Sequence, residues 1–177
     1  MREYVCAVGA SWGLQVFGAV HDAADHWGLA VFPDVLEAAV QAHPTPRYVF
    51  CLNWSHRVPP WMLDHSEWVN FHCTALPQGR GGHPIENLIV RGYTETVITA
   101  HRMVADMDAG PVYGRSESIS LAGSKAAIQQ RFVAPCVELI QEIVAREPMP
   151  VPQAGLPTWF ERLGPDAYQA IWASRRG

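Results

Sequence analysis

Residues 67–84 read EWVNFHCTALPQGRGGHP, which predicts a buried strand over 67–72 that runs into a glycine-rich loop, and this stretch decides the fold. Side chains two residues apart in a strand share a face, so Asn70 and His72 are expected to project together from the strand's end. The loop glycines, closed by Pro84, would let backbone approach a ligand closely. The stretch therefore predicts one edge of an active site.

The residues before this stretch alternate between apolar strands and helical segments. We predict strands over 4–8, 28–32 and 47–52, with helices between them that end near residues 20 and 42. This β-α-β-α-β order is typical of a mostly parallel, Rossmann-like α/β sheet covered by helices. Ligands of such sheets bind at the carboxyl ends of the strands, where Asn70 and His72 lie.

The second half changes character. We predict a helix over 84–91 closed by Gly92, strands over 96–103 and 112–120, and a helix from Ser124 that bends near Pro135. Between the two strands lies a loop, DMDAGP at 106–111, whose carboxylates can point into a cleft. We expect a single-domain fold, with residues 1–150 as the catalytic part and 151–177 as a C-terminal extension packing on it.

Composition argues against several classes of protein. The formal charge is −4 over 177 residues without a basic stripe, which argues against a nucleic-acid partner. The four cysteines form no Cys-x-x-Cys pair, which argues against zinc and fits a reducing cytosol. No apolar run resembles a membrane span or signal core, so we expect a cytoplasmic protein without membrane contact. Some of the seven tryptophans could serve as contacts in a homodimer.

The ordered motifs resemble those of the folate-dependent formyltransferases. That family has an Asn-x-His motif, a Leu-Pro and Gly-rich loop, and a downstream Asp in a Leu-Asp-x-Gly type loop, matched here by Asn70, His72 and Asp108. Its Gly-Asp-x-Glu-Thr turn matches GYTET at 92–96, and the resemblance covers roughly residues 48–131. Asp106 competes with Asp108, but only Asp108 precedes Ala-Gly-Pro. The family's small sugar N-formyltransferases have the most similar glycine-rich loop.

The resemblance implies an N-formyltransferase that uses N10-formyltetrahydrofolate as co-substrate and no metal. A primary amine would attack the formyl carbon while negative charge grows on the formyl oxygen. Asn70 and His72 would stabilise that oxyanion, each donor contributing roughly 2.7–4 kcal/mol. Asp108 would orient His72 and relay a proton through water.

The resemblance also implies two binding regions. The pterin would lie between two loops whose candidate contacts are Trp54, His56, Val58, Val104, Asp106 and Met107. The candidate contacts of the acceptor are Ser11, Arg80, Gly82, His83 and His101. A satisfied core histidine is an equal alternative for His101.

The acceptor is expected to be a small amine, with a nucleotide-linked amino sugar as the leading class. A chain ending at Gly177 leaves no room for the RNA-binding domain of methionyl-tRNA formyltransferases, and Trp12 occupies the turn that holds the phosphate of glycinamide ribonucleotide. Two alternatives stay open. One is a hydrolase that releases formate from the same co-substrate, and the other is a dinucleotide-binding module, suggested weakly by Gly9 and Gly13.

Overall fold

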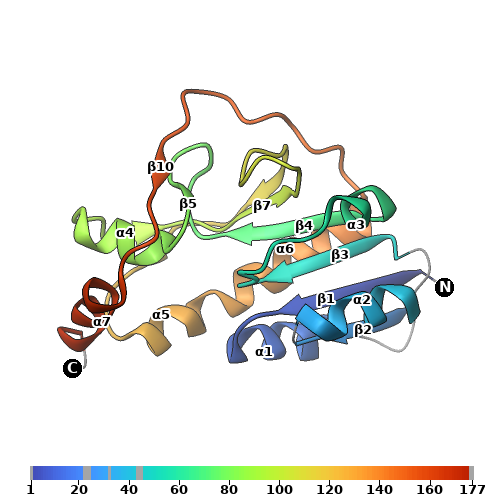
Figure 1. Ribbon diagram of the computed structural model, residues 1–177, viewed down its shortest axis with the longest axis horizontal. Helices are drawn as coiled ribbons and strands as arrows, with labels where there is room; N and C mark the ends of the chain where they lie inside the picture. The colour runs from blue at the N-terminus through green and yellow to red at the C-terminus, as the bar shows by residue number, and fades with distance from the viewer. Residues whose placement is uncertain (1, 22–24, 32, 43–45, 176–177) are drawn as a thin grey trace.

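The computed structural model describes residues 2–21, 25–31, 33–42 and 46–175 and has at its centre a six-stranded sheet (Figure 1). Its strands lie in the order β2-β1-β3-β4-β7-β8. Their bounds are β1 (Glu3–Val8), β2 (His26–Ala30), β3 (Tyr48–Leu52), β4 (Glu67–His72), β7 (Thr99–Arg102) and β8 (Val112–Arg115). The first four are parallel, whereas β7 runs antiparallel to both β4 and β8. The predicted mostly parallel, Rossmann-like α/β fold is confirmed.

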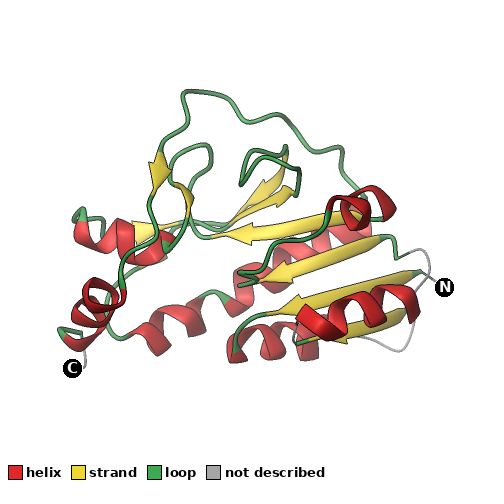
Figure 2. Ribbon diagram, in the orientation of Figure 1, coloured by secondary structure: helices red, strands yellow, loops and turns green. Residues whose placement is uncertain are grey.

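Helices cover both faces of the sheet (Figure 2). On one face, α1 (Ser11–Val20) and α6 (Val133–Arg146) contribute buried apolar side chains to the larger core cluster. On the other, α2 (Pro33–Ala42) and α3 (Pro60–His65) contribute Leu36, Val40 and Met62 to a smaller cluster. The remaining helices are α4 (Pro84–Val90), α5 (Lys125–Arg131) and α7 (Pro165–Ala173).

Strand alternation decides which face carries the polar residues of β4. Val69 and Phe71 belong to the α1/α6 cluster, whereas Trp68 belongs to the α2/α3 cluster. Because successive side chains point to opposite faces, Asn70 and His72 share the face of Trp68. The period-two pattern therefore places both polar side chains on one side of the sheet, at the strand's carboxyl end.

Several predicted boundaries differ from the structure. Each strand predicted over 96–103 and 112–120 is divided, because β6 (Glu95–Thr96) and β9 (Ile119–Ser120) form a ladder of their own. At the division, the Ser116 hydroxyl accepts from the Ile98 N–H at 2.9 Å, so a side chain replaces a backbone ladder partner. Strand β2 also lies two residues earlier than predicted, and residue 32 is outside the described residues.

The predicted bend near Pro135 lies too late in the chain. The helix is interrupted at Phe132, between α5 and α6. A proline ring clashes with the carbonyl four residues before it, which here is that of Arg131, so regular helix cannot continue across that point. Pro135 instead occupies the first turn of α6, where its missing N–H has no partner to lose.

Residues 147–164, here called the C-terminal arm, run from α6 across the molecule to α7 (Figure 1). Val151 exchanges two backbone hydrogen bonds with Val112 of β8, at 2.7 and 2.8 Å. Further along, β10 (Trp159–Phe160) pairs in parallel with β5 (Arg80–Gly81) of the glycine-rich loop. None of the helices in the described part of the chain is long and apolar enough to cross a membrane.

Candidate active site

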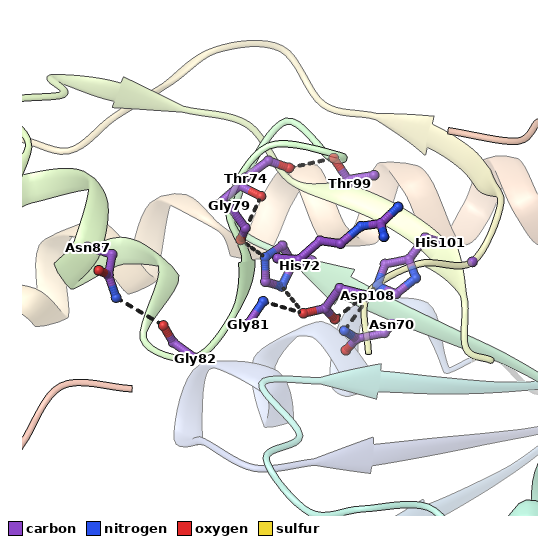
Figure 3. A network of polar contacts seen from close by, with 12 residues as sticks. Asn70, His72, Thr74, Gly79, Gly81, Gly82, Asn87, Thr99, His101 and Asp108 are labelled. Atoms are coloured by element: carbon purple, nitrogen blue, oxygen red, sulfur yellow. Dashed lines mark hydrogen bonds and ion pairs between the residues drawn. The ribbon is translucent and has the colours of Figure 1, made fainter. Parts of the chain in front are cut away.

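Two strands and one loop bring four polar side chains together at the carboxyl end of β4 (Figure 3). Strand β4 supplies Asn70 and His72, and β7 supplies His101, which pairs with Asn70 in the ladder. The loop between β7 and β8 folds back toward this end of β4 and supplies Asp108. Asn70, His72 and Asp108, the residues of the motif, are therefore neighbours in space.

Both ring nitrogens of His72 face polar atoms. Its Nε2 lies 2.8 Å from the carbonyl oxygen of Gly79, and its Nδ1 lies 3.7 Å from Oδ2 of Asp108. A carbonyl only accepts, so Nε2 is the nitrogen that carries the proton in the neutral ring. Burial lowers the pKa of His72, and the charge of Asp108 partly offsets this effect. His72 is thus a neutral imidazole whose Nδ1 can take up a proton beside a carboxylate.

Asp108 is held as a carboxylate. Its backbone adopts a left-handed conformation with φ of 52°, and its Oδ2 accepts from the Gly81 N–H at 2.9 Å. Burial would raise the pKa of Asp108, but His101, His72 and the Gly81 N–H outweigh burial and lower it to about 2. The group is therefore ionised at neutral pH and available to stabilise a proton on His72.

His101 joins the other end of the cluster. Its Nδ1 donates to the carbonyl oxygen of Arg102 at 2.9 Å, while its Nε2 lies 3.3 Å from Nδ2 of Asn70 and 3.5 Å from Oδ1 of Asp108. The four side chains therefore form a continuous series of contacts from Asn70 through His101 and Asp108 to His72. The ring of His101 is buried, with 1% of its surface exposed.

The glycines of the loop after β4 make room for the C-terminal arm. A Cβ added at Gly81 would lie 2.3 Å from the carbonyl oxygen of Phe160, and one at Gly79 would lie 2.5 Å from the Phe160 ring. The close approach that the sequence predicts is thus present, but the approaching backbone belongs to the chain itself. A Cβ added at Gly82 would likewise lie 3.0 Å from the Cβ of Arg162.

The other residues predicted to contact the acceptor also lie against the arm, apart from Ser11 and His101. The Arg80 guanidinium lies over the Trp159 ring at 5.7 Å from its centroid, and His83 Nδ1 accepts from the Leu163 N–H at 3.1 Å. Ser11 is exposed at the start of α1, at the same sheet edge as Asn70. Acceptor contacts by these residues stay predictions.

The two loops predicted to hold the pterin both border the α2/α3 face. Trp54 of the first loop and Met103, directly before the second, pack against the apolar cluster of that face, and Val58 is buried in it. His56 is exposed and its ring lies 5.3 Å from that of Trp54. On the second loop, Asp106 is exposed, as are Val104 and Met107, the latter with 63% of its surface accessible. The second loop thus offers apolar surface beside Asp108.

Sequence reasoning missed Gln153. Its side-chain amide donates to the carbonyl oxygens of Asp108 and Gly110, both at 2.8 Å, although it lies far along the chain from both. A single polar residue in a proline-rich connector carries no periodic signal, so only the tertiary structure reveals this contact. Thr158, which accepts from the Gly79 N–H at 2.8 Å, is a second example.

No family model matches the chain. A methionyl-tRNA formyltransferase from Dichelobacter nodosus is 29% identical over 146 residues, which cover 76% of this chain and 46% of that protein. The structure of a methionyl-tRNA formyltransferase from Clostridium thermocellum superposes with a TM-score of 0.86 at 26% identity, covering 94% of this chain and 74% of that chain. The chain thus spans less than half of the curated relative's length.

The chain is thus similar in sequence and in fold to the folate-dependent formyltransferases. The family's fold also extends to more distant structures. An N-formyltransferase from Helicobacter canadensis, solved with folinic acid and dTDP-3-aminofucose, superposes with a TM-score of 0.68 at 14% identity, covering 92% of this chain and 71% of that chain. In this chain the Asn-x-His pair and the aspartate of the motif lie in one cluster. Among the described residues, no group of three or more His, Cys, Asp and Glu side chains is arranged to hold a metal ion.

Proposed function

We propose that the chain is an N-formyltransferase that moves the formyl group of N10-formyltetrahydrofolate to a primary amine. The observation that carries the proposal is the series of contacts joining Asn70, His101, Asp108 and His72 in a chain similar to this family. It combines an uncharged donor, a titratable base and a buried carboxylate. Formyl transfer requires these three groups, because charge develops on an oxygen and a proton must leave the amine.

Asn70 would stabilise the developing oxyanion. One hydrogen of its amide faces Nε2 of His101, which leaves the second hydrogen for the formyl oxygen. Because His101 and the sheet hold the amide in place before the substrate binds, little reorganisation accompanies the growth of charge. The amide therefore acts as a preorganised donor.

His72 would accept and return the proton that is transferred in the reaction. As the tetrahedral intermediate forms and collapses, its Nδ1 takes the proton of the attacking amine and later returns one to the folate nitrogen. The ionised Asp108 stabilises the imidazolium in between, and the 3.7 Å gap from Nδ1 to Oδ2 is too long for a direct hydrogen bond. A water molecule in contact with both groups would complete the relay.

The folate co-substrate would supply the activated formyl carbon, and its pterin would lie between the loops at 54–58 and 104–107. Two features support this position. Trp54 and Val58 of the first loop pack on the apolar cluster of the α2/α3 face, and the exposed apolar side chains of Val104 and Met107 lie on the same loop as Asp108. Apolar surface with a few polar groups nearby is typical of sites for ring-shaped cofactors.

For the acceptor we propose a small amine, with a nucleotide-linked amino sugar as the first candidate. The chain's formal charge of −4 provides no general attraction for a polyanion such as tRNA. A specific observation favours a second candidate, the methionyl group on initiator tRNA, since the curated relative at 29% identity is a methionyl-tRNA formyltransferase. The same catalytic cluster would serve either amine.

The test is an assay with formyltetrahydrofolate and a panel of nucleotide-linked amino sugars, other small amines and methionyl-tRNA. Mass spectrometry would detect any acceptor that gains one formyl group, and release of formate without an acceptor would identify the hydrolase alternative. The His72→Ala variant is the control for uncatalysed transfer. No formylated product and no folate turnover would refute the proposal. Cytoplasmic residence and a homodimer stay predictions.

A further inference from the structure

We infer that Gln153 of the C-terminal arm is a positioning residue that holds the loop carrying Asp108 in its active conformation. This inference rests on the proposed function, because it concerns the same catalytic cluster. It makes the arm, which lies outside the region of motif resemblance, a component of the active site.

The Gln153 side chain uses its full hydrogen-bonding capacity. Its Nε2 donates to the carbonyl oxygens of Asp108 and Gly110, both at 2.8 Å. Its Oε1 accepts from Nη2 and Nε of Arg80, at 2.7 and 3.2 Å. Carbonyl oxygens only accept and a guanidinium only donates, so these partners fix the orientation of the amide. A primary amide is the group that satisfies this arrangement on both sides.

These contacts connect the glycine-rich loop to the loop that carries Asp108. Arg80 belongs to the glycine-rich loop, in which the Gly79 carbonyl accepts from His72 and the Gly81 N–H donates to Asp108. The loop from residue 103 to 111 has no strand or helix, and Asp108 itself adopts a left-handed backbone conformation. Gln153 therefore supplies partners for two carbonyls on a segment with little regular structure to hold it.

A purely structural role, in which Gln153 only attaches the arm, explains the contacts less well. The arm is already held by the Val151–Val112 pair, by the β10–β5 ladder and by the bond from Gly79 to Thr158. Removing Gln153 leaves all of these in place. The unique contribution of its Nε2 is to the loop carrying Asp108.

Two substitutions separate the roles. Gln153→Met keeps a side chain of similar length but removes both sets of hydrogen bonds. Gln153→Glu keeps the acceptor for Arg80 but cannot donate to the carbonyls of Asp108 and Gly110. We expect both variants to lower kcat about 10- to 100-fold, because misplacing a catalytic group by about 1 Å can cost 10²-fold, while KM for folate changes little. Gln169→Met, at an exposed position on α7, is the matched control and should keep wild-type kinetics.

A second measurement does not depend on catalysis. His72 faces Asp108, His101 and the Gly79 carbonyl, and the Asp108 charge raises its pKa. If the Asp108 loop moves in Gln153→Met, the His72 titration midpoint, followed by NMR, should fall below that of the wild type and of Gln169→Met.

Wild-type kinetics in Gln153→Glu, or an unchanged midpoint in folded Gln153→Met, would overturn the inference. If Gln153→Met does not fold, Gln153→Glu decides through the kinetics. If the wild type transfers no formyl group, the proposed function fails and the NMR comparison still decides the role of Gln153.

Discussion

His101 lies directly opposite Asn70 in the β4–β7 ladder, and its Nε2 atom is 3.3 Å from the Asn70 amide nitrogen. Because Nδ1 of His101 donates to the Arg102 carbonyl, Nε2 is the ring nitrogen that faces the Asn70 amide and Asp108. The NH2 end of Asn70 faces His101, so the orientation of this proposed oxyanion donor is set by a cross-strand partner rather than by the substrate alone.

We expect Asn70→Ala, which removes the oxyanion donor, and His72→Ala, which removes the proton acceptor, each to lower kcat by roughly 10²–10³. Far-UV circular dichroism should show that both variants keep the fold, because Asn70 is only partly buried and the core clusters lie elsewhere. Wild-type turnover in either folded variant would contradict the roles given to these side chains.

The relationship between His101 and Asn70 predicts graded effects at position 101. His101→Gln retains an acceptor for the Asn70 amide, whereas His101→Phe does not. We expect the phenylalanine variant to lose more kcat, by about 10-fold, since a displaced donor stabilises the oxyanion poorly. Steady-state kinetics on both variants would check this order. Equal activity of the two would show that His101 is only a core residue.

The sequence is sufficient to predict the elements in which apolar and polar residues alternate regularly. The bounds of β4 were predicted to the residue, and alternation along it put Asn70 and His72 on one face. The fold-back of the Asp108 loop and the position of Gln153 depend on tertiary contacts that leave no local pattern. The glycines were predicted to approach a ligand, but absence of a Cβ serves approach by the chain's own backbone equally well, as Gly81 and Phe160 show.

The buried state of His72 predicts a pH dependence of stability. Burial lowers the folded-state pKa below the ordinary value of about 6.5, so below that value the unfolded chain binds a proton that the folded chain does not. Keeping His72 neutral therefore costs no stability above about pH 6.5. As the pH falls from that value toward the folded-state pKa of His72, proton binding by the unfolded chain lowers the free energy of unfolding.

Urea unfolding at about pH 7.5 and about pH 5.5 would measure this effect, since the unfolded-state pKa lies between these values. The loss of stability on acidification should be smaller in His72→Gln than in the wild type. His26→Gln, at an exposed position on β2, is the control and should lose as much as the wild type. The same loss in His72→Gln would place the titrating group elsewhere.

Folate binding can be tested without catalysis. A non-reactive folate analogue at a hundred times its dissociation constant should stabilise the fold by about 2.7 kcal/mol, because a ligand that binds only the folded state stabilises it by mass action. NAD should give no shift in Tm if the dinucleotide-binding alternative is wrong. Stabilisation by NAD and none by folate analogues would favour that alternative.

The last prediction concerns the contact between the glycine-rich loop and the arm. Gly81 has φ of 107°, and a Cβ there would lie 2.3 Å from the Phe160 carbonyl oxygen, so Gly81→Ala adds a backbone clash to conformational strain. Gly92 has φ of 81° with nothing within 4 Å of its Cβ position, so Gly92→Ala is a matched control that adds strain alone, about 1–2 kcal/mol.

We expect Gly81→Ala to separate β10 from β5 and to displace the N–H that Asp108 accepts. Limited proteolysis should then cut the arm faster than in Gly92→Ala, and kcat should fall only in Gly81→Ala. Equal proteolysis and equal activity in the two variants would show that a small adjustment relieves the clash at Gly81 without releasing the arm or disturbing the site. Faster cleavage with unchanged kcat would show that the arm is held by Gly81 but that the catalytic cluster does not need it.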